Sequence, residues 1–102
     1  MARIELAPEI REDFDRIIDH LLQHEVKNPQ LRINAIISAI DLLESSPLVG
    51  RICDGELREL VIEQGTKGYV ALYQYIEDID VVFVLAIRSQ REAGYARDDR
   101  ET

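Results

Sequence analysis

Residues 56–95, ELRELVIEQGTKGYVALYQYIEDIDVVFVLAIRSQREAGY, decide the fold of this chain. β-Branched and aromatic residues dominate three runs in this stretch, and such residues favour a pleated, half-buried conformation. The runs predict strands near 57–63, 69–76 and 81–88. Because the two linkers are too short for a crossover helix, the three strands should pair antiparallel as consecutive hairpins.

The last run indicates that something packs on this sheet. Residues 81–87, VVFVLAI, are apolar without alternation, which is typical of a strand that is buried on both faces. We expect the preceding half of the chain to supply the cover.

Two helices are predicted in that first half. Residues 8–25 carry apolar side chains at helical spacing, and a second helix over 29–44 starts at Asn28-Pro29, so the two form an antiparallel hairpin. Residues 3–6 alternate polar and apolar side chains and are expected to add an edge strand. Residues 48–55 should have no regular structure.

The predicted order is β-α-α-β-β-β, an α+β fold in which a helical hairpin packs on one face of a small, mainly antiparallel sheet. The opposite face should be more open and suits a functional groove. Residues 1–95 are expected to form a single domain and 96–102 a short charged tail. The expected core contains Phe14, Ile18, Leu21, Ile36, Ile40, Leu60, Leu72, Phe83 and Leu85.

Composition argues against several classes of protein. The 102 residues carry a net charge of −8, whereas a free-standing binder of naked nucleic acid is usually basic. No apolar run is long enough to span a membrane and no N-terminal signal peptide is visible, so no membrane partner is expected. Cys53 is the single cysteine, which predicts a cytoplasmic location.

In their order and spacing, these segments resemble the RelE/ParE superfamily of bacterial type II toxins, found in toxin–antitoxin or plasmid stabilisation modules. The resemblance rests on the helical hairpin, the SSPLVGR connector at 45–51, the Gly-Tyr pair that opens the second strand, and the Arg-x-Gln-Arg-x-x-x-Tyr pattern at 88–95. It implies a compact α+β fold, a cognate antitoxin that wraps the toxin in a hetero-oligomer, and one of two targets. ParE-like members poison DNA gyrase, and RelE-like members cut messenger RNA in the ribosomal A site.

The residues match the RelE-like branch only in part. That branch cleaves RNA without a metal and needs cations around the phosphate. The matching first strand, 58–62, has no lysine, and Val70 stands where that branch has an arginine. Arg88 or Arg91 can match its third arginine and Tyr95 its terminal tyrosine, but the remaining pattern is closer to the ParE branch.

The resemblance gives five candidate target-binding residues and no confident catalytic residue: Arg58, Arg88, Gln90, Arg91 and Tyr95. Each arginine has a structural alternative, because Arg58 can close the sheet rim by pairing with a carboxylate and the others can pair with the antitoxin or an internal acid. Three functions stay open. They are a gyrase-binding toxin without chemistry of its own, a metal-independent and ribosome-dependent endoribonuclease, and a degenerate toxin that retains only antitoxin binding.

Other candidate groups have simpler interpretations, and no cofactor or metal is expected. His20 and His24 lie four apart on the first helix, a spacing that can hold a metal, but without an evident third ligand a solvated face is expected. Tyr69, Tyr73 and Tyr75 share one strand face, which favours core positions with hydrogen-bonded hydroxyls.

Overall fold

The computed structural model of the chain describes residues 1–24, 26–63 and 68–90. Its elements are β1 (Arg3–Leu6), α1 (Ile10–Gln23), α2 (Pro29–Leu42), β2 (Arg51–Asp54), β3 (Leu57–Ile62), β4 (Tyr69–Ile76) and β5 (Val81–Ser89), with a 3-10 turn at Glu77–Ile79. The strands form one sheet in the order β1-β5-β4-β3-β2. β1 runs parallel to β5, and the other neighbouring strands are antiparallel. The predicted α+β fold, the edge strand at 3–6 and the antiparallel meander are confirmed.

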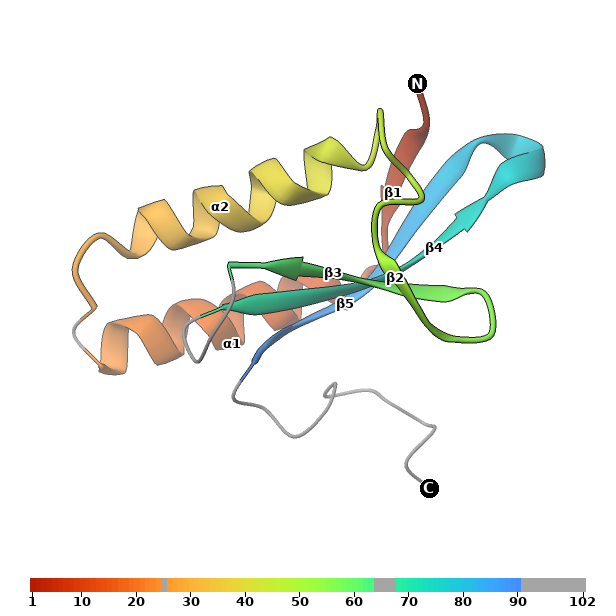
Figure 1. Ribbon diagram of the computed structural model, residues 1–102. Helices are drawn as coiled ribbons and strands as arrows, with labels where there is room; N and C mark the ends of the chain where they lie inside the picture. The colour runs from red at the N-terminus through yellow and green to blue at the C-terminus, as the bar shows by residue number, and fades with distance from the viewer. Residues whose placement is uncertain (25, 64–67, 91–102) are drawn as a thin grey trace.

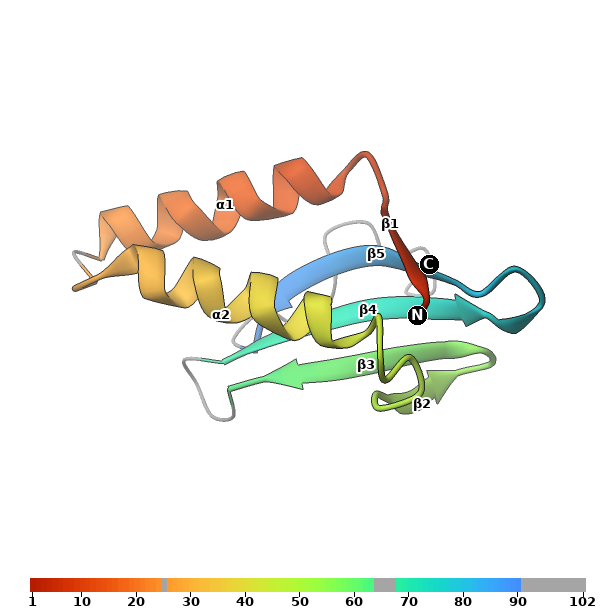
Figure 2. The ribbon, with the colours of Figure 1, turned by 90° about the horizontal axis from the view of Figure 1, so that it is seen from above.

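Both helices pack on the same side of the sheet, with α1 beside β5 and α2 nearer β3 (Figure 1, Figure 2). Asn28 precedes α2 in a left-handed conformation (φ 54°), which asparagine tolerates better than most residues, and Pro29 takes the first helical turn. The predicted hairpin is confirmed, with slightly shorter helices. The main core lies between the helices and the sheet, and its members include Ile17, Leu21, Ile36, Ile40, Leu43, Leu60, Ala71, Tyr73, Val82, Val84 and Ile87.

β2 shows that the prediction of an irregular connector at 48–55 was wrong. All four residues of the strand are exposed, so the strand has no buried face that a pattern of apolar residues could reveal in the sequence. Its extended conformation comes from pairing with the outer edge of β3, where Arg51 lies opposite Glu59. The hairpin turns at Gly55-Glu56, between the paired residues Asp54 and Leu57, and Gly55 supplies the positive φ (59°) that glycine adopts readily at the first position of a two-residue loop.

An irregularity in the β4–β5 ladder changes which β5 side chains face the helices. Leu72 lies opposite Ala86 and Tyr73 lies opposite Val84, so β5 carries one additional residue, Leu85, at this point. Strict alternation along β5 is therefore broken, and residues three apart, 84 and 87, both enter the main core.

The burial of the expected core residues follows from this arrangement. The prediction is confirmed at Leu21, Ile36, Ile40, Leu60 and Leu72. It was wrong at four residues that are only half-buried, namely Phe14, Ile18, Phe83 and Leu85. Phe83 lies opposite Gln74 on the face away from the helices, so burial of β5 on that face is incomplete.

Two adjacent isoleucines on α2 test the position of the core. Ile36 is 0% exposed and Ile37 is 45% exposed. Ile36→Ala should lower the free energy of unfolding by about 2–5 kcal/mol, because it leaves a cavity in the core. Ile37→Ala changes helix propensity by the same amount but should lower the free energy of unfolding clearly less, because this side chain is largely exposed. Chemical denaturation of both variants measures the difference, and equal losses would contradict the orientation of α2.

Candidate functional site

A cross-strand row on the face away from the helices ends in one of the candidate residues. Val61, Val70 and Arg88 are successive neighbours on β3, β4 and β5. Val70 is buried and belongs to a second apolar cluster on this face, together with Leu57, Leu72, Leu85 and Ala86. Arg88 thus lies at the border of a small apolar cluster whose Leu57 and Leu85 are only partly buried, and the position where the RelE-like branch has an arginine is occupied by a buried valine.

Arg88 and Gln90 lie together at the end of β5. The backbone N–H of Gln90 donates to the Gly68 carbonyl oxygen at 2.9 Å and so extends the β4–β5 ladder. The half-buried Arg88 donates from Nη1 to the Ser89 carbonyl at 3.1 Å. A Cβ at Gly68 would collide with the carbonyl of Glu63, so only glycine fits where β4 begins. The other two candidates of this group, Arg91 and Tyr95, lie outside the described residues.

Arg58 lies on the opposite face of the sheet from Arg88. It neighbours Tyr73, which points into the main core. Arg58 Nη1 donates to the carbonyl oxygens of Gly50 at 2.7 Å and Leu48 at 3.2 Å. Arg58 therefore ties the connector before β2 to the sheet through carbonyl groups. A contact between Arg58 and a target stays a prediction, but the structure does not bring Arg58 and Arg88 together.

Tyr73 holds the same connector from the other side. Its hydroxyl accepts from the buried Gly50 N–H at 2.8 Å and donates to the Pro47 carbonyl at 2.8 Å. Burial raises the pKa of this hydroxyl above its ordinary value of 10, although the bond to Gly50 and the charge of Arg58 partly oppose the shift. A Cβ at Gly50 would lie 2.6 Å from the Tyr73 ring, so the approach requires glycine. The expected core position with a bonded hydroxyl is confirmed.

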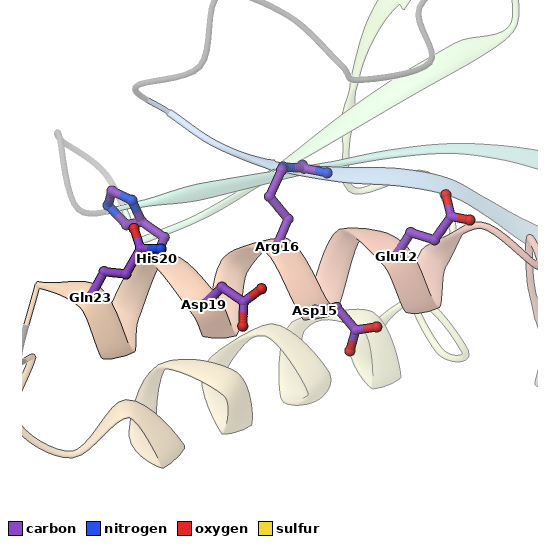
Figure 3. Close-up of a pocket in the computed structure, with 6 residues that line it drawn as sticks. All are labelled: Glu12, Asp15, Arg16, Asp19, His20 and Gln23. Atoms are coloured by element: carbon purple, nitrogen blue, oxygen red, sulfur yellow. The ribbon is translucent and has the colours of Figure 1, made fainter.

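Sequence reasoning missed a contact between α1 and β5. The carboxylate of Asp13, 1% exposed, accepts from the Ile87 backbone N–H at 3.0 Å and from Arg16 Nη1 at 2.9 Å. Arg16 Nη2 donates to the Ile87 carbonyl oxygen at 3.0 Å. Figure 3 shows Arg16 reaching from α1 toward the sheet. The available signal was a carboxylate at the border of an apolar helical stripe, three residues before an arginine.

The outer surface of α1 carries a hollow whose lining comes from this one helix, namely Glu12, Asp15, Arg16, Asp19, His20 and Gln23 (Figure 3). No second element of the described chain lines it. The His20 and His24 rings lie 4.2 Å apart between centroids and both are exposed, as expected for a solvated face. Within residues 1–24, 26–63 and 68–90, no three histidine, cysteine or acidic side chains come together as a metal site.

Comparison with known families agrees with this geometry. A family model described as the ParE toxin of type II toxin–antitoxin system, parDE, matches residues 4–94. The chain belongs to the ParE toxin family. The resemblance drawn from the sequence, including its closer match to the ParE branch, is thereby confirmed, and membership implies a cognate antitoxin partner. No curated protein matches the chain closely enough to add a named relative. Among the described helices of this ParE-family chain, none is long and apolar enough to cross a membrane.

Removing one hydroxyl tests how the connector is held. Tyr73→Phe should lower the free energy of unfolding by about 1–3 kcal/mol, because it leaves the buried Gly50 N–H without its acceptor. Tyr75→Phe is the matched control, because the Tyr75 hydroxyl donates to Asp80 at 2.6 Å in an exposed position. This variant should lower the free energy of unfolding by less than Tyr73→Phe does. Urea denaturation of both variants gives the comparison.

The wild type and Tyr73→Phe should also respond differently to alkaline pH. Because the pKa of Tyr73 is raised in the folded state, its contribution is fully present below about pH 10 and is lost as pH rises through the folded value. The stability difference between the wild type and Tyr73→Phe should therefore narrow above about pH 10. A difference that grows with pH would contradict the burial of this hydroxyl.

Proposed function

We propose that this ParE-family chain acts as a toxin by binding DNA gyrase through the end of β5, with no chemistry of its own. The row formed by Val61, Val70 and Arg88 carries the proposal. Metal-free RNA cleavage needs cations aimed at the charge that develops on the phosphorane, and a removed donor of this kind costs about 2.7–4 kcal/mol of transition-state stabilisation. Two valines cannot provide that stabilisation.

The charge around this row also favours a protein target over RNA. Glu59 lies on the same face as Val61 and pairs with Arg51 at 3.4 Å, so it adds a negative charge where a nuclease would need cationic side chains. The chain as a whole carries a net charge of −8, which disfavours docking against ribosomal RNA. An arginine beside partly buried leucines, here Leu57 and Leu85 of the second cluster, is in contrast typical of a protein interface.

The proposed target-binding residues are Arg88, Gln90, Arg91 and Tyr95. The first two share the end of β5, and the other two follow directly in the sequence. Arginine and tyrosine are the residue types that most often anchor protein interfaces, and Gln90 adds hydrogen-bonding groups. Arg58 is left out of this patch because it lies on the opposite face and donates to the Gly50 and Leu48 carbonyls.

Neutralisation by a cognate antitoxin forms the second part of the proposal. α2 exposes Leu31 and Leu42, which lie eleven residues apart and therefore on the same side of the helix. A C-terminal antitoxin segment that folds onto the helical hairpin would bury these side chains. Co-purification with the product of the neighbouring reading frame tests this part, and absence of a complex at micromolar concentration would count against it.

Binding of purified gyrase to variants of the β5 end tests the target. Arg88→Ala, and separately the double variant Arg91→Ala with Tyr95→Ala, should raise the Kd by at least about tenfold, as expected for interface anchors. Arg11→Ala is the charge-matched control, since Arg11 is exposed and lies about 200° around α1 from the buried Asp13, and it should leave the Kd unchanged.

Two outcomes would reject this assignment. An equal loss in Arg11→Ala would mean that binding depends on net charge alone. A wild-type chain that folds and binds its antitoxin but not gyrase would favour the ribosomal or the degenerate alternative.

A further inference from the structure

Asp13 and Arg16 meet both main-chain groups of a single residue on β5. β1 ends at Leu6, opposite Val84, and the Ala7 N–H continues this edge with one bond to the Val84 carbonyl at 2.9 Å. Beyond that point no described strand flanks β5 on this side. The acceptor and the donor that a neighbouring strand would supply to Ile87 come instead from the Asp13–Arg16 pair, which we call the α1 clip.

The ladder on the other side of β5 shows that the Ile87 groups point toward the clip. The Gln90 N–H donates to the Gly68 carbonyl, so residues 68 and 90 form a hydrogen-bonded pair. Such pairs alternate along an antiparallel ladder, which makes the Ala71–Ile87 pair a non-hydrogen-bonded one. The N–H and carbonyl of Ile87 therefore point away from β4, and the clip satisfies both.

We propose that the α1 clip positions the target-binding end of β5, which begins at the very next residue, Arg88. The ordering of residues 88–90 by the clip stands on the structure, and only the expected loss of gyrase binding rests on the proposed function. Upstream, β5 is held by β1 and by Val82 and Val84 in the main core. At its end, β5 is held by β4 on one side and by the clip on the other. Loss of the clip should thus release residues 88–90 while the rest of the sheet stays in place.

Asp13→Asn weakens the clip with almost no change in the shape of the side chain. A carboxylate offers two acceptors, whereas an amide offers one acceptor and one N–H₂ donor. In this variant the N–H₂ group of the new amide must face either the Ile87 N–H or the Arg16 guanidinium, so one of the two contacts is lost. Arg16→Met is an independent variant, because it keeps an apolar stem on the helix and removes only the donors.

The primary readout is the backbone order of individual amides in the full chain, from ¹⁵N relaxation. In Asp13→Asn and in Arg16→Met, the order parameters of residues 88–90 should fall from about 0.85 to below about 0.6, with those of 69–72 on β4 unchanged. Ile36→Ala, which leaves a cavity in the main core, is the stability-matched control and should leave residues 88–90 ordered. Because the two clip residues act as a unit, the double variant should be no worse than the more severe single variant.

The secondary readout is the Kd for gyrase, which should rise at least about tenfold in both clip variants and stay unchanged in Ile36→Ala. Unchanged order at 88–90, or a loss of order spread evenly over all strands, would overturn the inference, and so would disorder at 88–90 without any change in the Kd of a chain that binds gyrase. If the wild type does not bind gyrase, the proposed function fails, and the order of residues 88–90 alone decides whether the clip positions this segment.

Discussion

The structure depends on the way in which Asp13 and Arg16 complete the edge of β5 at Ile87. β1 is only four residues long and cannot cover the whole strand, so a helix supplies the missing partner groups. The Asp13 carboxylate is almost completely buried and is tolerated there because the Ile87 N–H and the Arg16 guanidinium both donate to it. Removing one partner of such a buried pair typically costs about 3–5 kcal/mol. The placement of α1 against the sheet and the direction in which β5 ends are therefore set by the same contact.

Several arginines of the described chain serve the architecture in a similar way, and this bears on function. Their partners are side chains for Arg3, Arg16 and Arg51 and carbonyl oxygens for Arg16 and Arg58. An acidic chain in which these four arginines have internal partners offers little positive charge to a phosphate backbone. The partly buried Leu57 and Leu85 of the apolar cluster that borders Arg88 are better matched to the surface of another protein. The composition of this face thus supports the proposed protein target.

The sequence predicted those elements whose signals are local. Apolar spacing located both helices, and the β-branched runs located β3, β4 and β5. β2 escaped prediction because all its residues are exposed and its conformation is imposed by the edge of β3. Phe83 was misplaced because the continuous apolar run of β5 predicted burial on both faces, whereas the face away from the helices is only partly covered at this residue. For Arg58 the sequence left open a target contact or a rim position paired with a carboxylate, whereas its partners in the structure are carbonyl groups of a connector that was expected to be irregular. The α1 clip could not be predicted, since Asp13 and Ile87 are 74 positions apart and only the folded chain brings them together.

The central claim is that this ParE-family chain acts on a protein target and does not cut RNA. Two assays on one preparation test it most directly: supercoiling by purified gyrase, and integrity of message bound to ribosomes, each titrated with the chain and with the chain saturated by its antitoxin. The account predicts that supercoiling is inhibited, that the antitoxin relieves this inhibition, and that the message stays intact. Cleavage of the message at A-site codons with supercoiling untouched would contradict it.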